Sequence, residues 1–109
     1  MENHAMVAAD RSGTIRIWSN GAEKLFGYAA ADALAQKLDL IVPEQYRDQH
    51  WAGFTKAMET GAAGLDGQST DIPVKCRSGD IAVFPASFML LRDARRDVIG
   101  AMVIFSQPG

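Results

Sequence analysis

The most informative stretch of the sequence runs from residue 15 to residue 28 and reads IRIWSNGAEKLFGY. Its first part, Ile15–Trp18, is mostly bulky and apolar and favours a β-strand. Ser19 or Asn20 then suits the cap of a helix, because its side-chain oxygen can accept a backbone N–H of the first turn. Gly27 is a typical helix end. The stretch therefore predicts a strand followed directly by a short helix, whose apolar face is formed by Ala22, Leu25 and Phe26.

The residues on either side extend this pattern. Upstream, two apolar segments within residues 6–18 flank Asp-Arg-Ser-Gly at residues 10–13, a sequence that suits a type I turn and predicts a β-hairpin. Downstream, the Ala-rich residues 29–35 favour a second short helix. Pro43 suits the first position of a longer helix that ends just before Gly61.

The long helix predicted after Pro43 carries an apolar stripe at helical spacing. The stripe consists of Tyr46, Trp51, Phe54, Ala57 and Met58. His50 falls inside this stripe, so we expect its imidazole to face the core of the domain.

The last third of the chain predicts three β-strands, at residues 68–76, 81–91 and 98–105. The first of them alternates and places on one face Thr70, Ile72, Val74 and Cys76. Pro73 within it implies an edge strand or a bulge. Five strands around a central block of helices indicate an α+β fold, a five-stranded antiparallel sheet with the helices on one face. The other face is apolar enough to need a cover and includes Ile81, Val83 and Met89.

Length and composition favour one ordinary globular domain. The chain has 109 residues, of which 48% are hydrophobic and 22% charged, and its net charge is −2. This near-neutral balance argues against direct binding of nucleic acid. The sequence shows neither the apolar run of a membrane span nor the pattern of a signal peptide, so we expect a cytoplasmic protein that does not enter a membrane.

Few residues carry catalytic chemistry. Cys76 is the only cysteine, so no internal disulfide can form, and two histidines cannot build a three-histidine metal site. Common catalytic motifs such as HExxH and GxSxG are missing. We therefore expect a protein that is not an enzyme and that takes any chemistry from a bound molecule.

The sequence closely resembles a PAS domain. The resemblance rests on Asp10-Arg11-Ser12-Gly13 and on residues 15–28, where Leu-Phe-Gly-Tyr at 25–28 is the most specific part. Comparable segments are Ile41-Val42-Pro43-Glu44, Thr60-Gly61, Arg77-Ser78-Gly79 and Val98-Ile99-Gly100. PAS domains usually have Asn directly after the position of Trp18, whereas this chain has Ser19 there. The resemblance covers residues 6–105, so residues 1–109 are interpreted as a single PAS domain.

This resemblance implies a sensory, signal-transducing module with a pocket between the sheet and the long helix. It also implies a homodimer that passes its signal through protein contacts to an output domain or partner, such as a kinase, a cyclic-dinucleotide enzyme or a transcription factor. The alternative is a cofactor-free interaction and dimerisation domain with a filled core.

His50 is the candidate cofactor ligand. Residues 40–54 resemble the matching segment of the heme-binding PAS domain in bacterial direct oxygen-sensor phosphodiesterases, where a His in this place is the proximal iron ligand. A neutral imidazole on an apolar helix face suits heme iron. Gln68 and Thr70 fall where those sensors have a ligating Met and an oxygen-binding Arg, and either side chain can hydrogen-bond a diatomic ligand. Heme, with His50 on the iron, is therefore the leading candidate cofactor.

Other interpretations of the pocket stay open. In the rhizobial oxygen-sensing kinases the ligand lies near the position of Gly64, so that version of the site is not expected here. The photoactive flavin-binding branch needs a Cys early in the long helix, and residues 44–49 contain none. Non-covalent flavin and another small organic ligand remain alternatives, as does Cys76 as a thiolate ligand. Without a cofactor, His50 would be a structural residue of the core.

Overall fold

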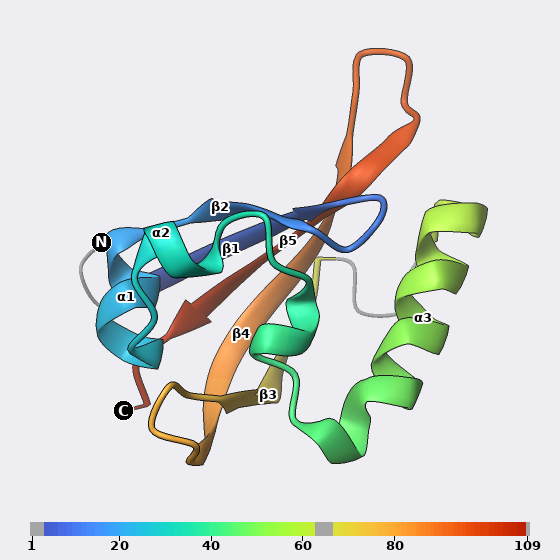
Figure 1. The fold of residues 1–109 in the computed structure, drawn as a ribbon. Coiled ribbons are helices and arrows are strands. Elements are labelled where there is room, and N and C mark those ends of the chain that lie inside the picture. The colour runs from blue at the N-terminus through green and yellow to red at the C-terminus, as the bar shows by residue number, and fades with distance from the viewer. Residues whose placement is uncertain (1–3, 63–66, 109) are drawn as a thin grey trace.

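The computed structural model describes residues 4–62 and 67–108 and contains a five-stranded antiparallel sheet (Figure 1). The strands are β1 (His4–Asp10), β2 (Ile15–Trp18), β3 (Ser69–Lys75), β4 (Ile81–Arg92) and β5 (Val98–Ser106). Their order across the sheet is β2-β1-β5-β4-β3, so β3 is an edge strand, as Pro73 predicts. The helices lie on one face of this sheet, which confirms the predicted α+β fold (Figure 1).

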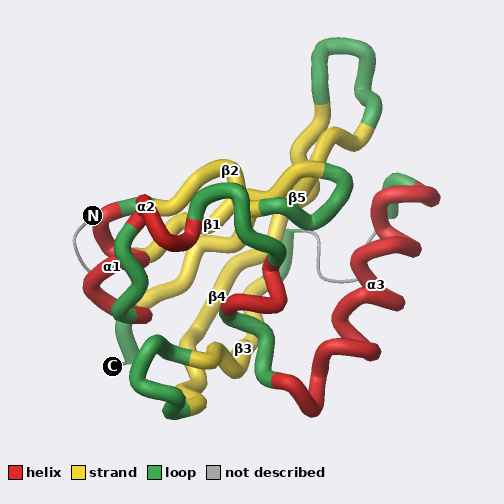
Figure 2. Tube along the Cα trace, viewed as in Figure 1, coloured by secondary structure: helices red, strands yellow, loops and turns green. Residues whose placement is uncertain are grey.

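The helical block connects β2 to β3 (Figure 2). It consists of the α-helices α1 (Asn20–Phe26), α2 (Ala30–Ala33) and α3 (Arg47–Thr60) and the 3₁₀ turns η1 (Leu38–Leu40) and η2 (Glu44–Tyr46). The predicted helix at 29–35 is shorter than expected, because Leu34 is extended and Ala35 has a φ of 70°. Tyr46, predicted in the apolar stripe, is 39% exposed, because it ends the 3₁₀ turn before α3 begins.

The stretch at residues 15–28 forms the predicted strand and helix. Ser19, rather than Asn20, caps α1: its Oγ accepts the backbone N–H of Ala22 at 3.2 Å and that of Met6 in β1 at 2.8 Å. Gly27 ends α1 with a φ of 92°, a left-handed conformation that glycine adopts at low cost. The cap therefore joins the helix to the strand beneath it.

Phe26, at the end of α1, lies at the centre of the main core. Its ring contacts Phe84 and Phe105 edge-on, with ring centroids 5.1 and 5.0 Å apart. Trp18 packs beside it and donates its indole N–H to the backbone oxygen of Tyr28 at 2.9 Å. The Leu-Phe-Gly-Tyr sequence thus supplies the central ring, the helix end and an anchor for the following loop.

A second, smaller core holds α3 against the sheet. It consists of Phe54, Ala57 and Met58 from α3 with Leu90, Val98 and Ala101 from β4 and β5. Leu38 of η1 packs against both cores. The helix is thus attached to the sheet through its own cluster of side chains, and within the described part of the chain one leucine links this cluster to the main core.

Trp51 connects α3 to the turn between β1 and β2. Its indole Nε1–H donates to Asp39 Oδ1 at 2.6 Å, and its ring lies so close to Gly13 that a Cβ there would overlap it. Gly13 has a φ of 79°, and its oxygen accepts the backbone N–H of Leu38 at 3.0 Å. The turn, η1 and α3 therefore meet at one indole ring.

We expect Gly13→Ala to destabilise the protein by about 2 kcal/mol or more, since the new methyl adds overpacking to backbone strain. In a Trp51→Ala background only the strain remains, so the cost of Gly13→Ala should fall by about 1–3 kcal/mol. Urea unfolding of the four proteins of this cycle measures the difference.

Gly79→Ala is the matched control. Gly79 has a φ of 94° and nothing within 4 Å of the added Cβ, so its substitution reports strain without overpacking. If Gly13→Ala lowered the free energy of unfolding equally with and without Trp51, the contact between Gly13 and the Trp51 ring would be contradicted.

Candidate functional site

His50 lies on α3 beside two aromatic rings. Its imidazole is 4.8 Å from the Trp51 ring and 5.9 Å from the Phe54 ring, centroid to centroid. The residue is half-buried, and its Nδ1 is buried without a hydrogen-bond partner. Burial lowers the pKa of His50 below 6.5, and the nearby Asp39 carboxylate offsets this only in part. The imidazole is therefore neutral at pH 7 and has an unpaired nitrogen.

Thr70 lies in β3 and Gln68 directly before it, whereas His50 lies on α3. Thr70 is half-buried in β3 opposite Ala86, and Gln68 is exposed just before that strand. The backbone oxygen of Gln68 accepts the backbone N–H of Phe88 at 3.3 Å, and Phe88 packs against the core beneath α3. Gln68 is thus bonded to a residue of the core beneath α3, whereas Thr70 pairs with Ala86 of the main core, and no hydrogen bond joins either to His50.

The chemistry of His50 and its surroundings can be compared with what heme iron requires of a protein ligand. An axial ligand must be neutral, must offer a free ring nitrogen and must sit in apolar surroundings, and His50 meets these conditions. Metal-bound histidines usually donate their second nitrogen to an oxygen. Asp39 is suited to this by charge and lies near enough to raise the pKa of His50, but its Oδ1 accepts the indole N–H of Trp51, and no hydrogen bond joins Asp39 to His50. His50 therefore fits as a ligand without the usual orienting partner.

The other candidate ligands contribute less. Cys76 is half-buried just after β3, and burial raises the pKa of its thiol, which opposes formation of a thiolate. The position of Gly64 lies outside the described residues. Within residues 4–62 and 67–108, no group of three His, Cys, Asp or Glu side chains could hold a metal ion.

The sequence did not predict a role for Asp39, and it predicted Gly13 only as a turn residue. Both act through Trp51, which belonged to the predicted stripe. Asp39 lies in the unpredicted turn η1, and nothing in the local sequence pairs it with a residue twelve positions later. Its role appears only when the helical block is folded.

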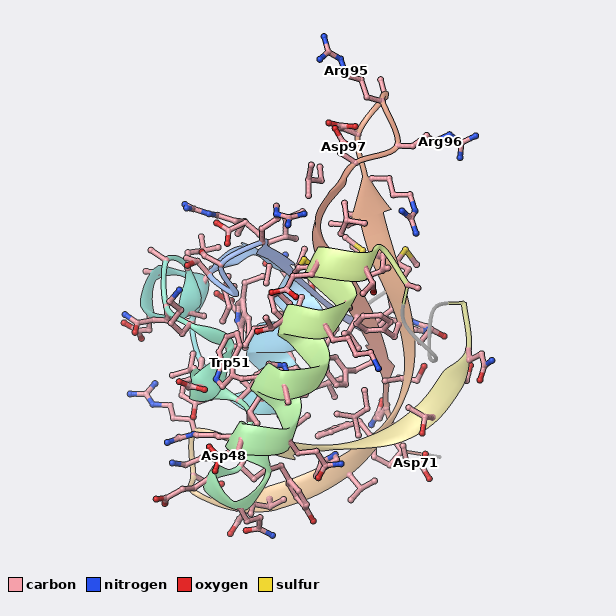
Figure 3. The ribbon with its side chains drawn as sticks, turned by 90° about the vertical axis from the view of Figure 1, so that its right-hand side faces the viewer. Asp48, Trp51, Asp71, Arg95, Arg96 and Asp97 are labelled. Atoms are coloured by element: carbon pink, nitrogen blue, oxygen red, sulfur yellow. The ribbon has the colours of Figure 1, made fainter. Side chains whose placement is uncertain are left out.

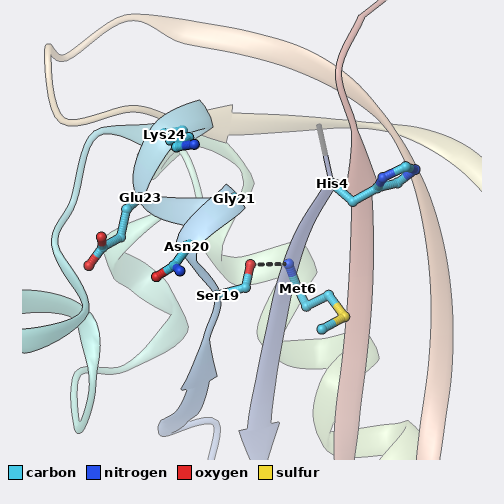
Figure 4. Close-up of a pocket in the computed structure, with 7 residues that line it drawn as sticks. All are labelled: His4, Met6, Ser19, Asn20, Gly21, Glu23 and Lys24. Atoms are coloured by element: carbon cyan, nitrogen blue, oxygen red, sulfur yellow. Dashed lines mark hydrogen bonds between the residues drawn. The ribbon is translucent and has the colours of Figure 1, made fainter. Parts of the chain in front are cut away.

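One surface hollow lies between β1 and α1, away from His50 (Figure 4). It has a volume of about 380 Å³ and is lined by His4, Met6, Ser19, Asn20, Gly21, Glu23 and Lys24. Helix α1 can approach β1 closely here because Gly21 has no side chain. A Cβ at this position would overlap the backbone oxygen of His4. The backbone N–H of Met6 donates to Ser19 Oγ, a hydrogen bond between two of the lining residues (Figure 4).

The face of the sheet opposite the helices exposes apolar side chains. Ile81 is 48% and Val83 54% exposed, and Met89 is half-buried. Ile17 and Ile99 are also exposed. In the part of the chain that the structure describes, no helix is long and apolar enough to cross a membrane.

The chain belongs to the PAS family. The family model described as the PAS fold matches residues 3–107, nearly the whole sequence. This confirms the resemblance that begins at the β1–β2 turn and continues through the Leu-Phe-Gly-Tyr sequence.

Relatives and solved structures agree with this assignment. The Sensor protein FixL of Bradyrhizobium diazoefficiens is 29% identical over 75 residues, which are 69% of this chain and 15% of that protein. A PAS domain from Colwellia psychrerythraea superimposes with a TM-score of 0.79 at 21% identity, covering 96% of this chain and 86% of that one. The PAS domain of the Cronobacter turicensis RpfR quorum-sensing receptor, in complex with C12:0, superimposes with a TM-score of 0.75 at 16% identity. This match covers 98% of this chain and 95% of that one. This chain therefore corresponds to a small part of the curated relative and to most of each solved domain.

The lowered pKa of His50 predicts a pH dependence of stability. The unfolded state takes up a proton near pH 6.5, before the folded state does, so acid favours unfolding. We expect the free energy of unfolding of the wild type to fall, relative to His50→Gln, as the pH drops from about 7 to about 5. Parallel pH profiles of the two proteins in urea unfolding would show that His50 is not held neutral by the fold.

Proposed function

We propose that this chain is a non-catalytic sensory PAS module that binds a small ligand or cofactor between the sheet and α3. Heme is the leading candidate, with His50 as its iron ligand. The module comprises residues 1–109 with its core at 6–105, acts in the cytoplasm and signals through protein contacts.

The observation that carries the proposal is the imidazole of His50. It is half-buried on an apolar helix face, its pKa is lowered, and its Nδ1 has no hydrogen-bond partner. A buried polar nitrogen without a partner costs free energy, so such groups call for an explanation such as a ligand. Iron coordination would supply that partner.

The relatives support the sensory class. FixL is named a sensor protein, and the RpfR domain is a receptor domain in complex with a small molecule. The second protein has the same fold at a TM-score of 0.75, so this architecture accommodates a ligand. By analogy we propose that the present domain takes its signal as a bound molecule.

In the heme version, the residues of this chain have distinct roles. His50 would hold the iron from α3, and the rings of Trp51 and Phe54 would fix the plane of its imidazole. Bound heme supplies an iron that takes up a small gas. Thr70, and Gln68 at the edge, would offer hydrogen bonds to that gas from the β3 side.

The output of the module is proposed to leave through the apolar outer face of the sheet. The exposed Ile81 and Val83 there favour burial against another protein surface. We propose a homodimer through this face, with an output domain or partner such as a kinase, a cyclic-dinucleotide enzyme or a transcription factor.

A second candidate function is a cofactor-free interaction domain. The close packing of Phe26, Phe84 and Phe105 supports it, because these rings occupy the inner face of the sheet beside α1. In this version His50 is a structural residue, and its removal would change stability and no spectrum.

Absorbance spectroscopy of the purified protein after addition of hemin tests the proposal. We expect a sharpened and shifted Soret band at one equivalent of hemin in the wild type. His50→Ala should abolish this shift, because the iron loses its axial nitrogen. Thr70→Val should keep the band and weaken the binding of a diatomic gas.

His4→Ala is the matched control, since His4 also has a buried Nδ1 without a partner but lies on β1, away from α3. It should bind hemin as the wild type does. A Soret shift that survives in His50→Ala would place the ligand elsewhere. Absence of any shift in the wild type would favour the cofactor-free domain.

A further inference from the structure

We propose that a surface hollow between the C-terminal end of α3 and the β4–β5 hairpin binds a phosphate group. The hollow has a volume of about 580 Å³. Three arginines from separate segments line it: Arg11 from the β1–β2 turn, Arg92 from the end of β4, and Arg96 from the turn between β4 and β5. His50 is not part of this lining, so the proposal is independent of the cofactor.

Backbone oxygens orient two of these guanidinium groups. Arg11 Nη1 donates to the oxygen of Val98 at 2.5 Å. Arg92 Nη2 donates to the oxygen of Gly61 at 2.7 Å, and its Nη1 to that of Arg96 at 3.5 Å. A guanidinium has five N–H donors in a planar fork, so these bonds fix its direction and leave donors for a ligand. The hollow therefore presents preoriented cationic donors.

Ion pairs do not neutralise these charges. Across residues 4–62 and 67–108, no ion pair involves Arg11, Arg92 or Arg96; the side-chain pair of Arg16 with Asp10 lies in the first hairpin. Asp93, at the start of the β4–β5 turn, uses its Oδ1 to accept the backbone N–H groups of Arg95 and Asp97. Two carboxylates, Glu59 and Asp97, also line the hollow, which leaves three positive charges against two negative ones. A net positive charge remains for an anion to balance.

The geometry favours phosphate over a carboxylate. A carboxylate offers oxygens in one plane, which suits a single arginine fork, whereas the tetrahedral phosphate offers oxygens to donors that approach from several sides. The arginines here line the hollow from two parts of the fold, Arg11 from the β1–β2 turn and the other two from the β4–β5 hairpin. Free inorganic phosphate and the phosphate monoester of a small molecule share this chemistry.

A phosphate bound here would act on the end of α3. The oxygen that Arg92 contacts belongs to Gly61, the residue that caps α3 with a left-handed backbone. A phosphate that recruits the remaining donors of Arg92 would change how this arginine holds the helix end. The amide signals of Gly61 and Val98 are therefore expected to report occupancy.

Titration of the ¹⁵N-labelled protein with inorganic phosphate, at constant ionic strength set with chloride, tests the site. We expect saturable NMR shifts that cluster at the end of α3 and at the start of β5. Arg11→Gln and Arg96→Asn should each weaken binding about tenfold, the effect of losing one charge-assisted hydrogen bond. Asn is chosen at position 96 because it tolerates the φ of 72° found there.

Arg95→Gln is the matched control. Arg95 belongs to the same turn but projects to another side of the hairpin than Arg96 (Figure 3), and we expect binding to change less than about twofold. A parallel titration with glycerol phosphate distinguishes the two sources of the phosphate group. Tighter binding of glycerol phosphate than of inorganic phosphate indicates a monoester ligand, and equal or weaker binding indicates free phosphate. Shifts that do not saturate, or an equal loss in Arg95→Gln, would overturn the proposal.

Discussion

The position of α3 depends on the indole ring of Trp51. The ring fits against Gly13, and its N–H binds Asp39, so the helix is fixed to the first hairpin and to η1 together. The hairpin turn is itself held by Asp10, whose carboxylate accepts hydrogen bonds from the turn and from Arg16, and these bonds hold its pKa well below its usual range. The place of the His50 imidazole relative to the sheet follows from this series of contacts.

The two cores divide the domain into a part built on the sheet with α1 and an attached helix, α3. The main core is centred on Phe26, whose ring packs α1 against Phe84 of β4 and Phe105 of β5. The core beneath α3 is smaller, and among residues 4–62 and 67–108 only Leu38 is a side chain packed against both. A ligand that displaces α3 therefore disturbs few of the contacts that stabilise the sheet. This separation gives a physical basis for sensing without unfolding, because the two arrangements of the helix would differ by a limited set of contacts.

The fold could be predicted because its signals are local. The Ser19 cap, the Gly27 helix end and the alternation in β3 each follow from nearby residues, and the structure has all three. The region around α3 could be predicted only in part. Periodicity placed Phe54 and His50 on one helix face, but the contact of Trp51 with Asp39 joins segments whose proximity depends on how the intervening turns pack. Such pairings leave no pattern in a single sequence.

The packing indicates that α3 is held separately from the main core. Native-state amide hydrogen exchange measures this directly, because it gives an opening free energy for each element. We expect the amides of α3 to exchange through an opening that costs less free energy than the opening that exposes β1 and β5. Equal opening free energies for α3 and for these strands would show a single cooperative unit and would contradict a separately held helix.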